Sequence, residues 1–468
     1  MFVACVFFVV ALALPGARAY PEDVFSSMYK TSDYESTVPI ALQVQGNIPE
    51  YLAGGRVVHN GCGGFGMGDH TFSHAFDCFA KLHSWSFEDT DKVTFSSKFL
   101  HSYFYNTSME LNDIWPAVFF GVEEPRFGMK DRMTAMMHSK PSDTVEGYDN
   151  FNVNLWDFGL KTPDGSEKML LAITDGLGFR GVGAESLSTH YFAFDNLSVT
   201  TNGTLSSAHP KYIPGTKTSV NYFIQPNNMV SAKGKLALYK QEYGSTSVSV
   251  FFEADIPSIN YMHSFSLTPN YAILFLNNCH FKESCVMSSM TKEWKGVSHC
   301  FSWEDSLDST TILVIGLKDG EIKMTIIPSF LDGQEYPFDF PLVNPNFVGH
   351  KHCIVYGMDS PFAGGSDRFS SGMWVKLNVC TGEVKVFNLE NHFATGDASF
   401  VPDPDSDDED GGVILTAWVD GTTGDGETYF RVIDAKTMEE VATVNFIEEE
   451  DKKIIMPYAF HGIWLGPE

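Results

Sequence analysis

The chain consists largely of short apolar or alternating runs that end at Gly, Asn, Asp or Pro. Typical runs are "KVTFSSKFLHSYFY", "SVSVFFEADIP", "TTILVIGLKDG" and "MWVKLNVCTGEVKVFNL". They have the length of strands and are rich in Val, Ile, Phe, Tyr and Thr, and almost no stretch has a sustained helical period. The pattern predicts an all-β fold.

Several of these runs come in pairs that share one formula: a strand, a turn such as "CTGE" or "DAKTMEE", and a second strand. Such hairpins are typical of propeller blades that close into a ring. The sequence has no strict repeat, so a two-sheet sandwich remains the structural alternative. The acidic run "PDPDSDDEDGG" at 402–412 is expected to be a solvated loop, because it lacks the ligand spacing of an EF-hand.

The charge balance excludes two classes of partner. The chain has 31 Lys and Arg against 59 Asp and Glu, which gives a net charge of −28. This excess of negative charge argues against a nucleic-acid partner and against electrostatic attachment to anionic lipid. A neutral or apolar ligand is favoured.

The N-terminus predicts a signal peptide. "MFVACVFFVVALALPGARAY" contains an apolar run, a Pro-Gly break and the small-x-small tripeptide ARA at 17–19, although a positively charged first region is missing. We therefore expect a signal peptide at 1–19, a single mature domain at 20–468 and a secreted protein; an uncleaved anchor is the alternative. Sequons at Asn106, Asn196 and Asn202 agree with glycosylation in the secretory route.

Cysteine usage fits an oxidising compartment without fixing the pairing. Loss of the signal peptide leaves seven cysteines, at positions 62, 78, 279, 285, 300, 353 and 380. An odd number requires a free thiol or an intermolecular bridge. Cys62 and Cys78 could form one local disulfide, and two of the three cysteines at 279, 285 and 300 another. No pair has CxxC spacing, so a thiolate zinc site is not expected.

Two histidines stand where strand ends would line the mouth of a β architecture. His263 lies in "NYMHSFSLTPNYAILFLNN", just before a turn and an apolar strand, and His461 lies in "PYAFHGIW" near the C-terminus. Residues this far apart in sequence meet only if the fold closes on itself, as a propeller does. Neutral imidazole is a common metal ligand, and a core histidine bonded to a carbonyl is the alternative for His461.

Four ordered blocks carry a family resemblance. They are "AGGRVVHNGCGGFGMGDHTFSHAFDCFAKLHSWSF", "YMHSFSLTPNYAILF", "YPFDFPLVN" and "PYAFHGIW". The chain, from about residue 40 to its end, resembles the carotenoid cleavage oxygenase family, especially the animal carotene oxygenases and the retinoid isomerase of the retinal pigment epithelium. The resemblance implies a seven-bladed β-propeller, here with one blade segment shortened or missing. It also implies Fe(II) on the axis, held by four histidines with three supporting carboxylates, and an apolar tunnel for a polyene.

The resemblance assigns the candidate ligands block by block. His263 matches the histidine of the family's "HSFGLTPNY"-like motif, and His461 matches that of its "FHG" terminus. The first ligand of the family precedes a Gly turn and a strand, which puts Gln225 of "YFIQPNNMVSAKGKLALYKQEYG" in its place. A competing placement on "SSAHPKYIP" makes His209 the ligand but mismatches the strand that follows.

The remaining positions also depart from the family pattern. For the third histidine, "VSHCFSWED" offers His299, unless this shortened region lacks the ligand altogether. The family's supporting glutamates fall on Asp175, Asp339 and Asp397. Each aspartate keeps the charge and shortens the reach by one methylene, about 1.3–1.5 Å of carbon chain.

Two functions follow from the resemblance. In the first, a non-haem Fe(II) site of the dioxygenase type cleaves a carotenoid, apocarotenoid or retinoid with O2. In the second, the metal is depleted and the chain binds such a polyene without cleaving it; the number of imidazole ligands separates the two. The apolar stretch at 114–122 is a candidate for peripheral membrane contact, with a buried strand as the alternative. A sugar-cleaving propeller would need paired carboxylates at a set separation.

Overall fold

The fold is given by a computed structural model of the whole chain. The structure describes residues 29–467 except 37, 117–119, 139–148, 198–203, 228–232, 257–258, 277–278, 282–300, 304–308, 318–321, 329–337, 360–372, 390–391, 421–426 and 447–455. The signal peptide expected at 1–19, Asn202, Cys285, His299 and Cys300 lie outside the described residues.

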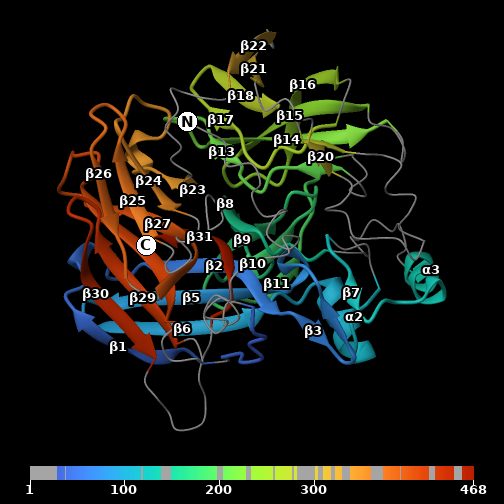
Figure 1. Cartoon of the computed structure of the whole chain (residues 1–468), viewed down its shortest axis with the longest axis horizontal. Helices are drawn as coiled ribbons and strands as arrows, with labels where there is room; N and C mark the ends of the chain where they lie inside the picture. Colours follow the sequence, from blue (N-terminus) through green and yellow to red (C-terminus); the bar gives the residue numbers. More distant parts are fainter. Residues whose placement is uncertain are drawn as a thin grey trace, which may run out of the picture.

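The described strands form antiparallel sheets that follow one another around a common axis (Figure 1). The first blade is built from the C-terminal strand β31 (Ala459–Leu465) together with β2 (Arg56–Gly64), β5 (Phe79–Asp89) and β6 (Lys92–Phe99). The second contains β8 (Asn154–Lys161), β9 (Lys168–Ile173), β10 (Arg180–Gly183) and β11 (Thr189–Tyr191). The third contains β12 (Leu205–Ser206), β13 (Lys211–Tyr212), β14 (Thr218–Pro226), β15 (Gly234–Glu242) and β16 (Val248–Ile256).

Three further blades complete the described part of the ring. The fourth contains β17 (Ser266–Leu267), β18 (Tyr271–Leu276), β21 (Ser309–Gly316) and β22 (Ile322–Pro328). The fifth contains β23 (Phe338–Leu342), β24 (Ile354–Asp359), β25 (Met373–Asn378) and β26 (Val384–Phe387). The sixth contains β27 (His392–Pro402), β28 (Gly412–Asp420), β29 (Glu427–Asp434) and β30 (Glu439–Phe446).

Smaller elements lie between the blades. A three-stranded sheet contains β3 (Gly66–Met67), β4 (His70–Phe72) and β7 (Glu123–Glu124), and a two-stranded sheet pairs β19 (Cys279–Phe281) with β20 (Phe301–Trp303). Two short helices, α2 (Tyr103–Leu111) and α3 (Met129–His138), lie at the periphery (Figure 1). Single 3-10 turns occupy Glu50–Leu52, Ala75–Asp77 and Pro345–Phe347. In the described part of the chain, no helix has the length and apolar character needed to span a membrane.

The all-β propeller prediction is confirmed, and the sandwich alternative is wrong. The ring is closed by β31, which pairs with β2 from the N-terminal part of the chain, so that red and blue strands lie side by side in Figure 1. Strand β1 (Ile40–Gly46) pairs with β6 on one side and β30 on the other, which joins the first and sixth blades at their outer edges. A seventh blade stays a prediction for the part of the chain that the structure does not describe.

Buried side chains fill the spaces between neighbouring blades. Trp85 of the first blade, with no exposed surface, stacks on Phe430 of the sixth at 4.7 Å between ring centroids. Leu82 of the first blade belongs to one cluster with Leu170 of the second, and Phe158 of the second to one cluster with Phe223 of the third. Successive side chains of a strand point to opposite faces of its blade. Both faces carry apolar residues, because each blade is covered by two others.

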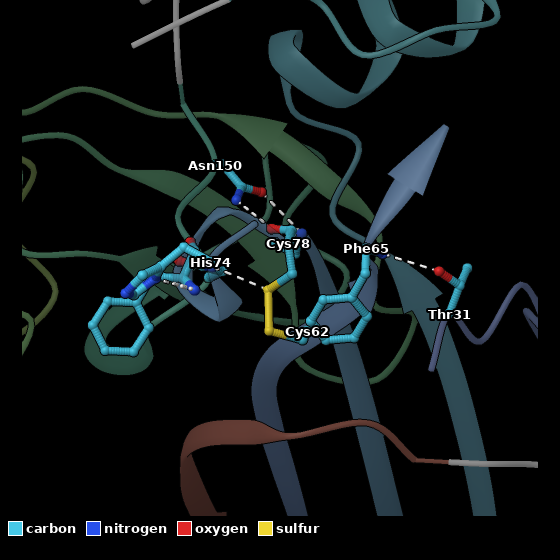
Figure 2. Close-up of a disulfide and its surroundings, with 9 residues drawn as sticks. Thr31, Cys62, Phe65, His74, Cys78 and Asn150 are labelled. Atoms are coloured by element: carbon cyan, nitrogen blue, oxygen red, sulfur yellow. Dashed lines mark hydrogen bonds between the residues drawn. A yellow bond between two sulfur atoms is a disulfide. The ribbon is translucent and has the colours of Figure 1, made fainter. Parts of the chain in front are cut away.

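Two disulfides are present in the described residues. Cys62 and Cys78, a pairing that the sequence left open, form a bridge that joins β2 to the residue before β5 (Figure 2). The Asn150 side chain holds this bridge in place by donating to the carbonyl oxygen of Cys78. A second bridge, Cys353–Cys380, flanks β24 and β25.

The acidic run at 402–412 is better anchored than a simple solvated loop. Glu409 accepts hydrogen bonds from the backbone N–H groups of Cys353 and Ile354 at 2.7 and 2.8 Å. Asp410 pairs with Lys376 at 2.6 Å. The run therefore ties the sixth blade to the fifth.

We expect Gly396 to be indispensable for closing the ring. Its φ is 155°, and a Cβ at this position would lie 1.6 Å from the carbonyl oxygen of Ala459 on β31. Gly396→Ala must therefore push β27 and β31 apart, at a cost of about 3 kcal/mol or more in the free energy of unfolding. Urea denaturation checks this, with Gly466→Ala as the control, because a Cβ there would come no closer than 3.7 Å to its nearest neighbour, Nε1 of Trp464. Equal loss of stability in the two variants would contradict the prediction.

Candidate metal centre

Three histidines from three blades converge near the axis. His461 lies on β31, His263 just before β17, and His209 in the segment between β12 and β13. One ring nitrogen from each lies within 4.8 Å of the other two. The Nε2 atoms of His209 and His263 are 2.9 Å apart, and the ring centroids of His209 and His461 are 4.3 Å apart. The expected meeting of His263 and His461 is therefore seen, and His209 completes the group.

Carboxylates orient two of the three rings. Nδ1 of His263 lies 2.9 Å from Oδ2 of Asp175, and Nδ1 of His461 lies 3.0 Å from Oδ2 of Asp397. A carboxylate accepts the Nδ1 proton of a neutral imidazole, so each ring turns the Nε2 lone pair toward the cluster. Asp175 and Asp397, both expected from the sequence, thus contact the rings despite their shorter reach.

The donor set fits a transition-metal ion. Two imidazole nitrogens on adjacent positions of an octahedral ion, each about 2.1 Å from it, are about 2.9–3.0 Å apart. The separation of 2.9 Å between the Nε2 atoms of His209 and His263 matches this geometry. An all-imidazole set suits iron, copper, nickel or zinc better than it suits magnesium or calcium.

The pKa values of His209 and Asp175 are both shifted downward. Burial lowers the pKa of His209 well below its usual value, and the neighbouring rings of His461 and His263 lower it further. Burial raises the pKa of the Asp175 carboxyl, but His263 and the hydrogen bonds that Asp175 accepts outweigh burial, so the pKa lies below its ordinary value. A neutral imidazole and an ionised carboxylate are the forms that bind and orient at a metal site.

A local irregularity aims Asp397 at the axis. The pairing of β27 with β28 is interrupted between Ala394 and Ala398, which releases the intervening residues from the ladder. Such bulges redirect side chains and are frequent near functional sites. Here the bulge contains Gly396, whose missing side chain lets β27 approach β31. This close approach compensates for the short aspartate.

Asp175 contacts two further groups besides the ring of His263. Its Oδ2 also accepts the hydroxyl proton of Tyr261 at 2.5 Å, and its Oδ1 accepts the backbone N–H of Ala208 at 3.2 Å. Ala208 precedes His209, so one carboxylate contacts the ring of His263 and the chain that carries His209. Tyr261 was not among the predicted site residues.

The structure brings His209, the competing placement, into the cluster, whereas the preferred assignment named Gln225. Gln225 lies on β14 and pairs with Lys235, whereas β12 and β13 both pair along β14 and carry His209 between them to the axis. The expectation that no third histidine lies nearby is therefore corrected. The prediction for Gln225 relied on matching the strand that follows the ligand. The strand after His209 is the two-residue β13, which is too short to show a recognisable sequence pattern.

Two predicted positions cannot be placed at the centre. His299 lies outside the described residues. Asp339 lies on β23, where its backbone pairs with Met358, and its side chain is outside the described part. The neighbouring Phe340 has a φ of 50°, unusual for a bulky residue, and its ring centroid is 5.4 Å from that of His461.

A cluster of aromatic rings beside the disulfide includes Phe340, whose ring contacts His461. Phe460 packs edge-on against Phe76 at 5.3 Å and against Tyr458 at 5.2 Å. These rings share a buried cluster with Cys62 and Cys78. In the candidate membrane segment at 114–122, Ile114, Trp115 and Val122 are buried, and 117–119 lie outside the described residues.

Known sequences resemble this chain along almost its whole length. The family described as Retinal pigment epithelial membrane protein matches residues 29–331 and 323–466. Beta,beta-carotene 15,15'-dioxygenase of Gallus gallus is 24% identical, over 90% of this chain and 95% of the relative. Carotenoid isomerooxygenase of Galleria mellonella is 22% identical, over 97% of this chain and 99% of the relative.

Solved structures share the fold. Cobalt-substituted apocarotenoid oxygenase of Synechocystis superposes with a TM-score of 0.76 at 18% identity, covering 96% of this chain and 99% of that one. A chimera of the same oxygenase superposes with a TM-score of 0.75 at 19% identity, covering 96% of this chain and 99% of that one. The chain therefore belongs to the Retinal pigment epithelial membrane protein family, the carotenoid oxygenases, and has their β-propeller fold.

Proposed function

We propose that this protein is a non-haem Fe(II) dioxygenase that cleaves a double bond of a carotenoid, apocarotenoid or retinoid. The observation that carries the proposal is the convergence of His209, His263 and His461, with two of the rings oriented by Asp175 and Asp397. In the reaction, one C=C bond breaks, and each of its carbons receives one atom of O2 to become a carbonyl. The polyene is thereby oxidised and O2 reduced, so no further reductant is required.

The residues present determine what the protein contributes. Ferrous iron held by the three imidazoles would supply open positions for O2 next to the polyene. The carboxylates of Asp175 and Asp397 accept the two Nδ1 protons, so each ring presents its Nε2 atom as the donor to a metal. The ring of Phe340 beside His461 would exclude water and offer a polyene the contact surface it prefers.

We further propose that the protein is secreted. The two disulfides agree with folding in an oxidising compartment. Asn106 on α2 and Asn196 in a turn are both exposed, so an oligosaccharide can reach them. A peripheral membrane contact near 114–122 remains part of the proposal, because a polyene substrate partitions into lipid.

Iron content and polyene cleavage test the proposed activity together. The protein, reconstituted anaerobically with Fe(II), should hold about one iron per chain, because neutral imidazoles are good donors for this metal. Addition of air and β-carotene or an apocarotenal in detergent should bleach the polyene band. With 18O2, both product carbonyls should carry the label.

Two variants serve as controls for that measurement. His209→Ala should lose iron and bleaching, whereas Gln225→Ala should retain both, because β14 is one strand further from the axis. A protein without iron that gives a stable, shifted polyene band would overturn the oxygenase proposal in favour of a binding protein.

Removal of the supporting carboxylates should weaken metal binding unequally. Asp397→Ala should reduce Co(II) affinity about 10- to 100-fold, the usual effect of losing such a partner. Asp175→Ala should have the larger effect, because Asp175 also holds Tyr261 and the chain before His209. Asp113→Ala is the matched control. Oδ1 of Asp113 lies 2.8 Å from Nδ1 of His70, a histidine outside the cluster. Titration followed by absorption gives the affinities, and equal values in the three variants would contradict the expectation.

Secretion predicts a specific pattern of glycans. Expressed with its own N-terminus in animal cells, the protein should appear in the medium, and peptide N-glycosidase should reduce its mass. Asn106→Gln and Asn196→Gln should each remove one glycan, whereas Asn47→Gln should not, because this exposed residue is outside any sequon. Retention inside the cell in unglycosylated form would contradict the proposed localisation.

A further inference from the structure

His209 differs from the other two histidines in how it is held. His263 and His461 each have a carboxylate on Nδ1, but no carboxylate oxygen contacts the ring of His209 among the residues that the structure describes. The chain around His209 is also irregular, because it links two strands of only two residues each. Some other contact must fix the direction of its Nε2 atom.

Buried asparagines hold the backbone in front of His209. Asn221 donates from Nδ2 to the carbonyl oxygen of Ser207 at 2.9 Å, and Asn154 donates from Nδ2 to that of Ala208 at 2.7 Å. The N–H of His209 itself donates to Oγ of Ser207 at 2.9 Å. Each of the two residues before His209 therefore has its carbonyl group fixed by an amide from another strand.

The two amides cannot rotate freely. Oδ1 of Asn154 accepts the N–H of Leu155 at 2.8 Å, and Oδ1 of Asn221 accepts the N–H of Tyr222 at 2.8 Å. Asn154 is 6% exposed and Asn221 is 2% exposed, so water does not compete strongly for these bonds. Each asparagine thus has one local bond that orients it and one long-range bond that reaches the segment of His209.

Asn154 is itself held by a third asparagine, Asn60, on the strand that pairs with β31. Asn60 on β2 donates from Nδ2 to the carbonyl oxygens of Phe151 at 2.6 Å and Asn154 at 3.2 Å. Its cross-strand partner is His461. Hydrogen bonds donated by the side-chain amides of Asn60 and Asn154 therefore connect the strand beside His461 to the segment of His209.

We propose that Asn154 and Asn221 are positioning residues for the metal centre, and that they set the position of His209 through its backbone. Asp175 and Asp397 hold the other two rings through Nδ1, whereas the asparagines hold His209 through the two carbonyl groups before it. The inference rests on the proposed metal-binding function. Neither asparagine touches the cluster itself, so their effect is on the geometry of the ligand and not on its charge.

Asparagine-to-aspartate variants isolate the proposed contacts. Asn154→Asp and Asn221→Asp keep the size of the side chain and the Oδ1 acceptor but remove the Nδ2 donor. Asn150→Asp is the matched control, because Asn150 is similarly buried, accepts the N–H of Ala80 at 2.9 Å and donates to Cys78 and not to the segment of His209. All three changes place the same new carboxyl at a buried position.

The measurement is a Co(II) titration of each folded, purified protein, followed by the visible absorption of the bound ion. We expect Asn154→Asp and Asn221→Asp to bind Co(II) about 10- to 100-fold more weakly than the wild type, with shifted bands. Asn150→Asp should lower the melting temperature but leave the affinity and the bands unchanged.

The outcomes separate this inference from the proposed function. If the asparagine variants at 154 and 221 bind Co(II) as tightly as Asn150→Asp and with the same bands, the positioning role is wrong and the metal centre stands. If the wild type itself binds no Co(II), the proposed metal centre is wrong. If Asn154→Asp does not fold, Asn221→Asp decides the question by the same criterion.

Discussion

The pairing of the last strand with a strand near the start of the chain is the constraint on which the candidate metal centre depends. β31 reaches the axis by pairing with β2, and this register places His461 opposite Asn60. His209 and His263 lie in blades that follow one another in sequence, whereas His461 belongs to the blade that closes the ring. Without closure, the three rings could not share a point, because no local segment of the chain brings them together.

Closure also explains how aspartates contact rings that glutamates would reach more easily. Asp397 projects from an interrupted stretch of β27, and Gly396 beside it lets that strand approach β31 more closely than any other residue would allow. Asp175 follows the end of β9, outside the regular ladder. In both places the backbone is outside regular strand pairing. It can therefore lie closer to the histidine ring, which compensates for the shorter side chain.

Regular features of this protein were predictable, and irregular ones were not. Alternating runs indicated the strands, and the motifs around His263 and His461 identified those residues because both adjoin recognisable strands. His209 was less recognisable than Gln225, since the segment that holds it has no period and its neighbour β13 is too short to identify. Asn154, Asn221 and Tyr261 were missed because their roles depend on contacts between distant parts of the chain. A buried asparagine within the apolar run "VNYFI" was the available signal for one of them.

The position of β31 has a consequence for how the protein is made. Since His461 follows every strand of the other blades in sequence, the ribosome must complete all of those strands before the third imidazole exists. Blades two to four can form earlier, because each pairs strands that are close in sequence, but β2 must wait for its partner. A nascent chain therefore exposes the edge of β2 and carries at most two of the three described imidazoles. The three-histidine cluster is accordingly completed only after β31 has been synthesised and has paired with β2.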